Sequence, residues 1–519
     1  MRTPTNNSTT DILLCTLNAK YIHSAFGLRY LYANLQELQS QACILEYTIN
    51  DDLVQITEDL LSKAPKIIGF SVYIWNVEQT ERLVAMVKKL APNCIVVLGG
   101  PEVSHEYNEQ SIVTLADYVI TGEGETAFVE LCRAILQQTP RTNKILFGGL
   151  PEVSQLQLPY QFYSDTDIAH RVIYVEASRG CPFKCQFCLS SLDTKVRDFP
   201  LEKFLQEMQT LLDRGARHFK FVDRTFNLKV KTSTAILQFF LDNIPIYPDI
   251  FLHFEMVPDR FPTELQAYVQ QFPLGSMQFE IGIQTFNVDV ASRIERRQDY
   301  PAVDRNIQFL QQTGVHLHTD LIIGLPGEDM ESFATGFNHL LSLGVEEIQV
   351  GILKRLRGTK IAMHTTDFQQ IYTAQPPYEV LANSHIPFME MNRLKRFARY
   401  WTIIGNSGRF QQSLSHFTKQ ASPFHAFLQF SDWLFTTCNR TNNISYNNML
   451  QYIGRYWSIE HQTDVYASLI QDYQQNTGKN HIPKFLDPKF DPKDGSTESE
   501  TPSEQNKPAY NARQRKHQE

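Results

Sequence analysis

The sequence has no long apolar run and no excess of positive charge. We find no stretch of about 18 apolar residues, so no membrane-spanning helix is predicted. The first ten residues are polar and lack the apolar segment of a secretory signal peptide, and we therefore expect a cytoplasmic location. Asp and Glu outnumber Lys and Arg by 56 to 48, which gives a net charge of −8. Because nucleic-acid-binding proteins usually present a basic face, this balance argues against nucleic acid as a partner.

Cysteine is also scarce, with eight residues in a chain of 519. Five of them are scattered, most within apolar runs, and are predicted to be small buried hydrophobic residues. The other three, Cys181, Cys185 and Cys188, lie close together. A disulfide framework is not expected in a long cytosolic chain, so this spacing favours a metal or cluster site.

The first part of the chain alternates short apolar segments with longer amphipathic ones. The predicted strands are Asp11–Leu17, Ala42–Ile49, Ile67–Tyr73, Cys94–Gly99 and Tyr118–Thr121. Helices are expected between them, for example at Val77–Leu90 and Glu125–Leu136. Such alternation predicts an α/β fold with a doubly wound, Rossmann-like parallel sheet in residues 1–145. A stretch rich in Pro and Gln then predicts a linker at 146–168.

A second alternating region follows, and we expect it to occupy residues 169–370. Its predicted strands are Val172–Glu176, His218–Val222, Phe251–Met256, Met277–Ile283, Leu317–Ile323 and Glu346–Gly351. Six strands with helical connections indicate a (βα)6 partial TIM-type barrel. Residues 371–486 are helical and aromatic in character and predict a mostly α-helical region. Residues 487–519 are rich in Ser, Glu, Lys and Pro, which is typical of a disordered tail.

The three clustered cysteines directly follow the first predicted barrel strand, with the spacing C-x3-C-x2-C. Three thiolates can hold three irons of a [4Fe–4S] cluster and leave the fourth iron open to a small chelating molecule. Zinc is the alternative, but a closed zinc site needs a fourth ligand. His170 and His218 are available, although neither has the spacing of a paired ligand.

This motif resembles the signature of radical S-adenosylmethionine (SAM) enzymes. The resemblance implies that the amino and carboxylate groups of SAM chelate the open iron and that SAM is reductively cleaved to a 5′-deoxyadenosyl radical. Phe187, just before the last cysteine, matches the aromatic residue that contacts the adenine in that family. The resemblance also implies an electron donor of flavodoxin or ferredoxin type.

Later segments resemble the branch that contains the oxygen-independent coproporphyrinogen oxidases. The matching segments are residues 254–258, 282–286, 294–297 and 319–327. This resemblance implies that the ribose hydroxyls or the methionine end of SAM contact Glu255, Gln284, Arg296 and Asp320. Carboxylates accept from hydroxyls and arginine pairs with a carboxylate, so the chemistry agrees. Asp223 follows the second barrel strand, where the family often places a residue near the methionine amine, although the usual Gly-Gly-Glu is absent.

Three loops of the first region contain small or acidic residues at the ends of predicted strands. Doubly wound sheets bind ligands beyond these carboxyl ends, and glycine allows a ligand to approach the backbone. No G-x-G-x-x-G follows the first strand, which argues against a dinucleotide. The loops resemble those of the cobalamin-binding domain in front of many radical SAM enzymes. By this resemblance the nucleotide tail and the corrin edge are lined by Ser71, Gly99, Gly100, Glu123 and Gly124. Trp75 either shapes the corrin face or is a buried aromatic residue.

In the cobalamin domain of methionine-synthase type, an Asp-x-His-x-x-Gly motif supplies a histidine to cobalt. Here Tyr21 stands in place of the aspartate, and Gly27 follows His23 by four residues instead of three. We therefore expect His23 not to bind cobalt.

The three implied cofactors, a [4Fe–4S] cluster, SAM and cobalamin, predict an enzyme that methylates an unactivated carbon of an unknown small-molecule or peptide substrate. One alternative is a cobalamin-dependent radical cyclase or rearrangement enzyme without methyl transfer. Another, from a different class, is a metal-bearing RNA-binding module. Segments 376–381 and 405–410 resemble an uncharacterised extension of some cobalamin-binding radical SAM proteins.

Overall fold

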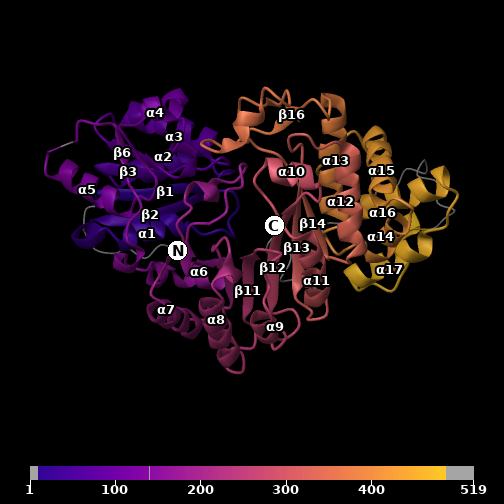
Figure 1. Ribbon diagram of the computed structural model, residues 1–519. Coiled ribbons are helices and arrows are strands. Elements are labelled where there is room, and N and C mark those ends of the chain that lie inside the picture. The colour runs from indigo at the N-terminus through magenta and orange to yellow at the C-terminus, as the bar shows by residue number, and fades with distance from the viewer. Residues whose placement is uncertain (1–9, 140, 487–519) are drawn as a thin grey trace.

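Three parts follow one another along the chain in a computed structural model that describes residues 10–139 and 141–486 (Figure 1). A sheet with helices on both faces comes first, a second sheet with helices outside it lies in the middle, and a helical region packs beyond it. This arrangement confirms the predicted fold class. Among the described residues, none of the helices has both the length and the apolar character needed to cross a membrane. The predicted tail at 487–519 lies outside the described residues.

The first sheet has six parallel strands in the order β2-β1-β3-β4-β5-β6. Their bounds are β1 Ile12–Asn18, β2 Ala42–Thr48, β3 Ile67–Ser71, β4 Ile95–Gly99, β5 Tyr118–Thr121 and β6 Ile145–Phe147. The chain steps from β1 outward to β2 and then returns to β3 on the other side. The strand order therefore reverses next to β1, the position at which doubly wound sheets bind ligands.

Helices cover both faces of this sheet. Alternate side chains of the central strand β1 point to opposite faces, so this strand contributes to two cores. Leu13, Cys15 and Leu17 belong to one core, and Ile12 and Leu14 belong to the other. The first core is closed by α2 Leu53–Ser62, α3 Val77–Leu90 and α4 Ser111–Leu115, and the second by α1 Phe26–Ala33 and α5 Glu125–Leu136. Burial on both sides explains why β1 reads as a continuous apolar run.

The second sheet also has six parallel strands, in the order β14-β13-β12-β11-β10-β7. They are β7 Ile173–Val175, β10 His218–Phe221, β11 Phe251–Met256, β12 Met277–Gln284, β13 His316–Ile323 and β14 Glu347–Ile352. The accompanying helices are α7 Leu201–Asp213, α8 Val230–Asn243, α9 Thr263–Val269, α10 Val288–Arg293, α11 Tyr300–Gln311 and α12 Met330–Ser342. Because β7 and β14 are edge strands, the sheet is an open, partial barrel.

Polar side chains alternate with apolar ones along β13, and this alternation fills the inner side of the barrel with charge. Leu317 and Leu321 are buried in the core shared with the helices, whereas His318 and Asp320 lie on the other face of the strand. The period of two places every second residue on the inner face. The barrel interior is therefore able to bind a polar ligand.

The C-terminal region continues the core of the barrel through aromatic rings. It contains the strands β15 Ile371–Tyr372 and β16 Val380–Ala382, and the helices α13 Phe388–Ile404, α14 Gln411–Thr418, α15 Pro423–Cys438, α16 Tyr446–Arg455 and α17 Tyr466–Thr477. The ring centroid of Phe337 in α12 lies 4.8 Å from that of Trp401 in α13. The Trp401 centroid in turn lies 5.0 Å from that of Phe427 in α15. Aromatic pairs at such distances stabilise packing beyond the area they bury.

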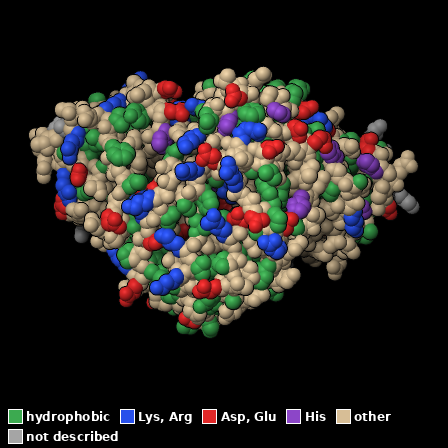
Figure 2. Space-filling model, in the orientation of Figure 1, with side chains coloured by type: hydrophobic (Ala, Val, Ile, Leu, Met, Phe, Trp, Pro, Cys, Tyr) green, Lys and Arg blue, Asp and Glu red, His purple; other side chains and the backbone are tan. Residues whose placement is uncertain are grey.

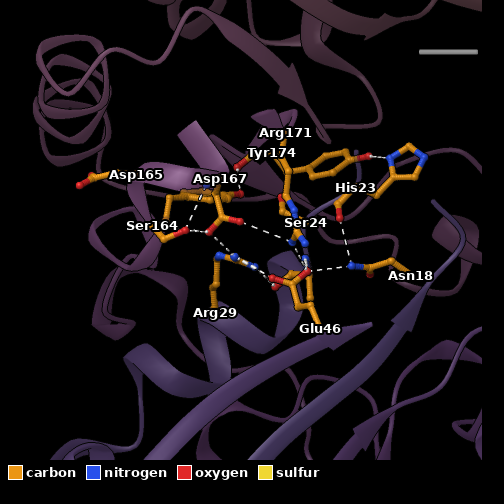
Figure 3. A network of polar contacts seen from close by, with 12 residues as sticks. Asn18, His23, Ser24, Arg29, Glu46, Ser164, Asp165, Asp167, Arg171 and Tyr174 are labelled. Atoms are coloured by element: carbon orange, nitrogen blue, oxygen red, sulfur yellow. Dashed lines mark hydrogen bonds and ion pairs between the residues drawn. The ribbon is translucent and has the colours of Figure 1, made fainter. Parts of the chain in front are cut away.

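A buried group of four charges joins the first sheet to the segment before the barrel (Figure 3). Arg29 of α1 lies 2.7 Å from Glu46 of β2 and 2.8 Å from Asp167 of α6 (Asp165–His170). Arg171 lies 3.0 Å from the second oxygen of Glu46. All four side chains are at most 10% exposed. Loss of one partner would leave a buried charge uncompensated, so the pairs hold the first domain in one position on the barrel.

Several short elements were not predicted from the sequence, among them β6 and α6. Strand β6 extends the first sheet beyond the five expected strands, and α6 begins within the expected linker, which ends at residue 168, and continues to His170. Strand β6 has only three residues, too few for an alternating pattern to be recognised. Helix α6 begins with a capping box, in which Ser164 and Asp167 exchange hydrogen bonds, and this signal is visible in the sequence.

Candidate functional site

The three clustered cysteines lie on one loop at the carboxyl end of β7. Cys181 and Cys185 are buried and Cys188 is half-buried. Two backbone contacts hold the loop: Cys181 N donates to Asp193 O at 2.9 Å, and Gln186 N donates to Ile294 O at 3.0 Å. Burial raises the pKa of the Cys181 thiol, so iron binding has to displace its proton. The loop therefore presents three thiol groups from a fixed backbone.

A cluster and a single zinc ion place different demands on this loop. Among the described residues, no three His, Cys, Asp or Glu side chains converge where one metal ion could be held. A structural zinc ion needs four ligands around one atom, whereas in a [4Fe–4S] cluster each thiolate binds a different iron. The loop carries the three thiols that the predicted cluster needs.

The cysteine loop forms one wall of a cavity of about 130 Å³ at the mouth of the barrel. Five of the residues predicted to bind SAM line the same cavity: Phe187, Glu255, Gln284, Arg296 and Asp320. They come from the loop itself, from the strand ends of β11, β12 and β13, and from the segment after α10. The structure thus brings together side chains that are up to 133 positions apart, as the resemblance implied.

Arg296 is the residue of this cavity with the clearest capacity for a ligand. Its Nη1 lies 3.5 Å from the Cys185 sulfur, and its Nη2 donates to the carbonyl of Gly282. Its Nε is buried and has no hydrogen-bond partner. Buried donors nearly always find an acceptor, so the guanidinium fits a ligand that carries a carboxylate.

Two charged residues that sequence reasoning missed also line the cavity, Arg224 and Glu280. Arg224 Nη1 donates to both oxygens of Glu255, at 2.8 and 3.1 Å. Glu280 lies 3.0 Å from His253 and 3.3 Å from Lys220. The period-two pattern of β12, which places Glu280 on the same face as Gln284, is the signal that could have found it.

The carboxylates of this cavity differ in the direction of their pKa shifts. Burial raises the pKa of Glu255 and of Asp320 above the ordinary values. Burial acts on Glu280 in the same direction, but the hydrogen bond with His253 and the charge of Lys220 outweigh it and lower its pKa. His253 itself is neutral at pH 7, because burial lowers its pKa to about 4. Glu280 therefore keeps its charge at neutral pH.

Asp223 is the one predicted SAM residue that the structure does not bring to this cavity. Its carboxylate accepts from Ala177 N at 3.0 Å and from Ser178 Oγ at 2.6 Å, and it is 3% exposed. It lines a separate cavity of about 220 Å³ on the other side of the cysteine loop. Its neighbour Arg224 takes the place in the SAM cavity, because successive residues after β10 point in different directions.

The first domain has its own cavity, of about 230 Å³, at the carboxyl ends of β3, β4 and β5. All five residues predicted to bind cobalamin line it: Ser71, Gly99, Gly100, Glu123 and Gly124. Gly100 has φ +108°, and a Cβ there would lie 2.5 Å from the carbonyl of Val72. Only glycine fits this turn, which leaves the backbone open to a bulky ligand.

Trp75 lies outside the wall of this cavity and is 44% exposed. Its ring stacks on that of Tyr73, with 4.3 Å between the ring centroids, and Tyr73 lines the cavity together with Phe70 and Phe128. The alternative that Trp75 is a buried aromatic residue is therefore wrong, and Tyr73 lies between Trp75 and the cavity.

Comparison with protein families agrees with both cavities. The family described as B12 binding domain matches residues 12–132, and the radical SAM superfamily matches residues 175–339. The chain carries a B12-binding domain followed by a radical SAM domain. A third family, a protein family of unknown function (DUF4080), matches residues 366–518. It covers the region in which the sequence resembled an uncharacterised extension.

Curated relatives are distant. TokK of Streptomyces tokunonensis, a cobalamin-dependent radical SAM methyltransferase, is 25% identical over 328 residues, which cover 56% of this chain and 47% of TokK. The uncharacterised methyltransferase PH0819 of Pyrococcus horikoshii is 24% identical and covers 64% of this chain and 77% of its own length. The chain thus spans about half the length of TokK.

Among solved structures, the cobalamin-dependent SAM radical enzyme OxsB shares the fold along most of the chain. The two superpose with a TM-score of 0.61 and 13% identity over 91% of this chain and 81% of OxsB. This likeness covers the B12-binding domain, the barrel and part of the C-terminal region together.

Two charged residues that sequence reasoning missed also line the cavity of the B12-binding domain, Glu125 and Arg179. Glu125 begins α5 and belongs to the same Gly122-Glu123-Gly124-Glu125 loop as two predicted residues, so its position was a usable signal. Arg179 belongs to the radical SAM domain, and no pattern in the sequence places it against the first sheet. The cavity is thus built by both domains.

The distribution of charge bears on the predicted absence of nucleic acid as a partner. On the face that Figure 2 shows, Lys and Arg side chains are interspersed with Asp and Glu. A nucleic-acid-binding face usually carries a stripe of one sign. This face has no such stripe.

Proposed function

We propose that this chain is a cobalamin-dependent radical SAM methyltransferase that transfers a methyl group to an unactivated carbon. The carrying observation is that the residues predicted for each cofactor, except Asp223, line one cavity each, and that Arg179 of the first cavity lies two positions before Cys181 of the second. TokK and PH0819, which are named methyltransferases, support the reaction class.

The cofactors are assigned by the donor groups of each cavity. Cys181, Cys185 and Cys188 would hold the [4Fe–4S] cluster, and Arg296, Glu255, Gln284, Asp320 and Phe187 would hold SAM. Ser71, Gly99, Gly100, Glu123 and Gly124 would hold cobalamin. When bound, the cluster and SAM supply a carbon-centred radical, and cobalamin supplies a transferable methyl group.

The side chains of the chain itself bind and orient. Arg296 offers its unpaired Nε to the carboxylate of SAM, and its Nη1 places a positive charge beside the Cys185 sulfur. Glu255 is held in place by Arg224 and accepts hydrogen bonds from hydroxyl groups. Glu280, clasped by His253 and Lys220, keeps a fixed negative charge at the inner end of the cavity.

An electron donor of flavodoxin or ferredoxin type belongs to the same proposal. Cys185 lies at the wall of a hollow of about 440 Å³, which is also lined by the cations Lys184, Arg296 and Arg297 and by the carboxylates of Asp259 and Glu295. Lys184 and Arg297 are exposed, and Arg260 lies close by, 5.5 Å from the ring of Phe183 in the same wall. The excess of positive over negative side chains supports docking of an acidic redox protein near the cluster.

Product analysis tests the reaction. The anaerobically reconstituted enzyme is incubated with a reductant, SAM labelled in its S-methyl group, and a metabolite extract from a strain that lacks the gene. We expect S-adenosylhomocysteine and 5′-deoxyadenosine in comparable amounts, and label in a new product. The variant in which all three cluster cysteines are replaced by Ala should give neither.

The outcome also separates the alternatives. Formation of 5′-deoxyadenosine together with a changed metabolite, but without S-adenosylhomocysteine or label transfer, would favour the cobalamin-dependent cyclase or rearrangement enzyme. Absence of SAM cleavage, with RNA retained by the purified protein, would favour the metal-bearing RNA-binding module.

A further inference from the structure

The cavity of the B12-binding domain contains a carboxylate with one unused oxygen. Glu125 is 6% exposed, and its Oε1 accepts from Arg179 Nη1 at 2.8 Å. Its Oε2 is buried and has no hydrogen-bond partner. Because buried polar atoms nearly always have a partner, this oxygen is available to a donor on whatever fills the cavity.

Arg179 forms ion pairs with carboxylates of both domains. Its guanidinium lies 2.8 Å from Glu123 and from Glu125 of the B12-binding domain, and 2.8 Å from Glu176 at the end of β7. The side chain is 13% exposed and sits over the ring of Tyr30 at 4.5 Å. Charge-assisted hydrogen bonds of this kind are short and directional, so the position of Arg179 depends on both domains.

A short series of contacts then connects Arg179 with the cluster cysteines. Arg179 precedes Cys181 by two residues and pairs through the backbone with Arg197, in the ladder of β8 (Ser178–Arg179) and β9 (Arg197–Asp198). Arg197 bonds Glu123 and also lies 2.7 Å from Asp193. The carbonyl of Asp193 accepts from Cys181 N at 2.9 Å. A residue of the cobalamin cavity is therefore three contacts away from a cluster ligand.

We propose that Glu125 accepts a hydrogen bond from an amide or hydroxyl donor of the bound corrinoid, and that Arg179 couples occupancy of this cavity to the position of the cysteine loop. The inference rests on the proposed function, since it takes cobalamin and the cluster as the two ligands. Arg179 is a positioning residue, because it acts on the cluster through the loop. Coupling of this kind is reciprocal: cluster loading must strengthen cobalamin binding by the same factor by which cobalamin strengthens cluster loading.

Affinity for hydroxocobalamin, measured on the full-length protein with and without the reconstituted cluster, tests the coupling. We expect the wild type to bind at least about fivefold more tightly when the cluster is present. Arg179→Gln should abolish this ratio, because the neutral side chain no longer draws the three carboxylates together, and Arg179→Lys should retain part of it. Arg355→Gln is the matched control, since it breaks a different inter-domain ion pair, with Glu106 at 3.0 Å, and should keep the full ratio.

Glu125→Gln tests the hydrogen bond to the ligand. Replacing the carboxylate by an amide turns one acceptor oxygen into a donor, which then faces a donor on either Arg179 or the ligand. The affinity for hydroxocobalamin should therefore fall about tenfold, or about 1.4 kcal/mol. Glu130→Gln, on the same helix but exposed, should bind like the wild type. Circular dichroism identifies any variant that fails to fold, and Arg179→Lys and Glu125→Gln then decide.

Unchanged affinity in Glu125→Gln, or a cluster-dependent ratio that is absent in the wild type or survives in Arg179→Gln, would overturn this inference. Failure of the wild type to bind any hydroxocobalamin would instead contradict the proposed function, so the two failures are distinguishable.

Discussion

His23 of the B12-binding domain and Tyr174 of the barrel strand β7 share a hydrogen bond, with 2.7 Å between the imidazole Nδ1 and the tyrosine hydroxyl (Figure 3). The loop that carries His23 also contacts the barrel through Ser24, whose hydroxyl donates to Val172 O at 3.1 Å. In this chain, the loop after β1 therefore serves to dock one domain on the other. Burial lowers the pKa of His23, so this contact is made by the neutral ring at pH 7.

The first prediction concerns His23. His23→Ala should leave the cobalamin content and the electron paramagnetic resonance spectrum of cob(II)alamin unchanged, while unfolding becomes easier by about 1 kcal/mol because one inter-domain hydrogen bond is lost. Tyr174→Phe removes the same bond from the other side and should show a similar loss of stability. Nitrogen hyperfine splitting that disappears in His23→Ala would show that the histidine binds cobalt.

The second prediction concerns the cluster. The anaerobically reconstituted protein should contain about four irons per chain, and replacing Cys181, Cys185 and Cys188 together with Ala should remove both the iron and the cleavage of SAM. Cys438→Ala, in the C-terminal region, is the control and should keep both. Stoichiometric zinc without iron in anaerobically purified protein would contradict the assignment.

A third prediction uses the steric limits of the SAM cavity. A Cβ at Gly282 would lie 2.5 Å from Gln284 Nε2 and 3.3 Å from Arg296 Nη2, so Gly282→Ala should displace two side chains that we propose to bind SAM, without disturbing the backbone. Affinity for SAM, measured by equilibrium dialysis, should fall about tenfold or more. Gly351→Ala on strand β14 is the matched control, because its nearest contact is 3.5 Å. Equal SAM affinity in the two variants would mean that Gln284 and Arg296 do not hold SAM.

The fourth prediction concerns Asp223, whose pKa burial raises to about 7 from an ordinary value of 3.8. Between about pH 4 and pH 7 the unfolded chain has lost this proton and the folded chain keeps it, so stability falls as the pH rises through this window. Asp223→Asn keeps a hydrogen-bonding group without a charge and should flatten the profile. At pH 8 it should exceed the wild type in free energy of unfolding by on the order of 2 kcal/mol.

Urea denaturation at pH 5 and pH 8 checks this prediction. Asp198→Asn, which changes an exposed carboxylate in the wall of the same cavity, should leave the pH profile as in the wild type. A wild-type stability that rises steadily from pH 5 to pH 8, with the same slope in Asp223→Asn, would show that Asp223 is already ionised in the folded protein.

Much of the architecture could be predicted because the burial of a strand determines which of its residues are apolar. The continuous apolar run of β1 indicates a strand covered on both faces, and the alternation in β13 is typical of a strand covered on a single face. Strand β6 was missed because its three residues pair only at the edge of the sheet. The candidate residues of the SAM cavity came from the family resemblance, and those of the B12-binding domain came from loops at the ends of parallel strands together with a resemblance.

By itself, the sequence determined the order of the domains and the spacing of the three clustered cysteines, since these depend on patterns along the chain. Only the tertiary structure decided how the two domains meet. Arg179 reaches Glu123 and Glu125 across more than fifty positions, and Glu46 finds Arg171 across the same boundary. Such ion pairs have no periodic signal, because a charged residue looks the same in sequence whether it faces water or a partner. Their positions are set by the packing of the two domains. Packing also places Arg224 at the SAM cavity and Asp223 at a separate cavity.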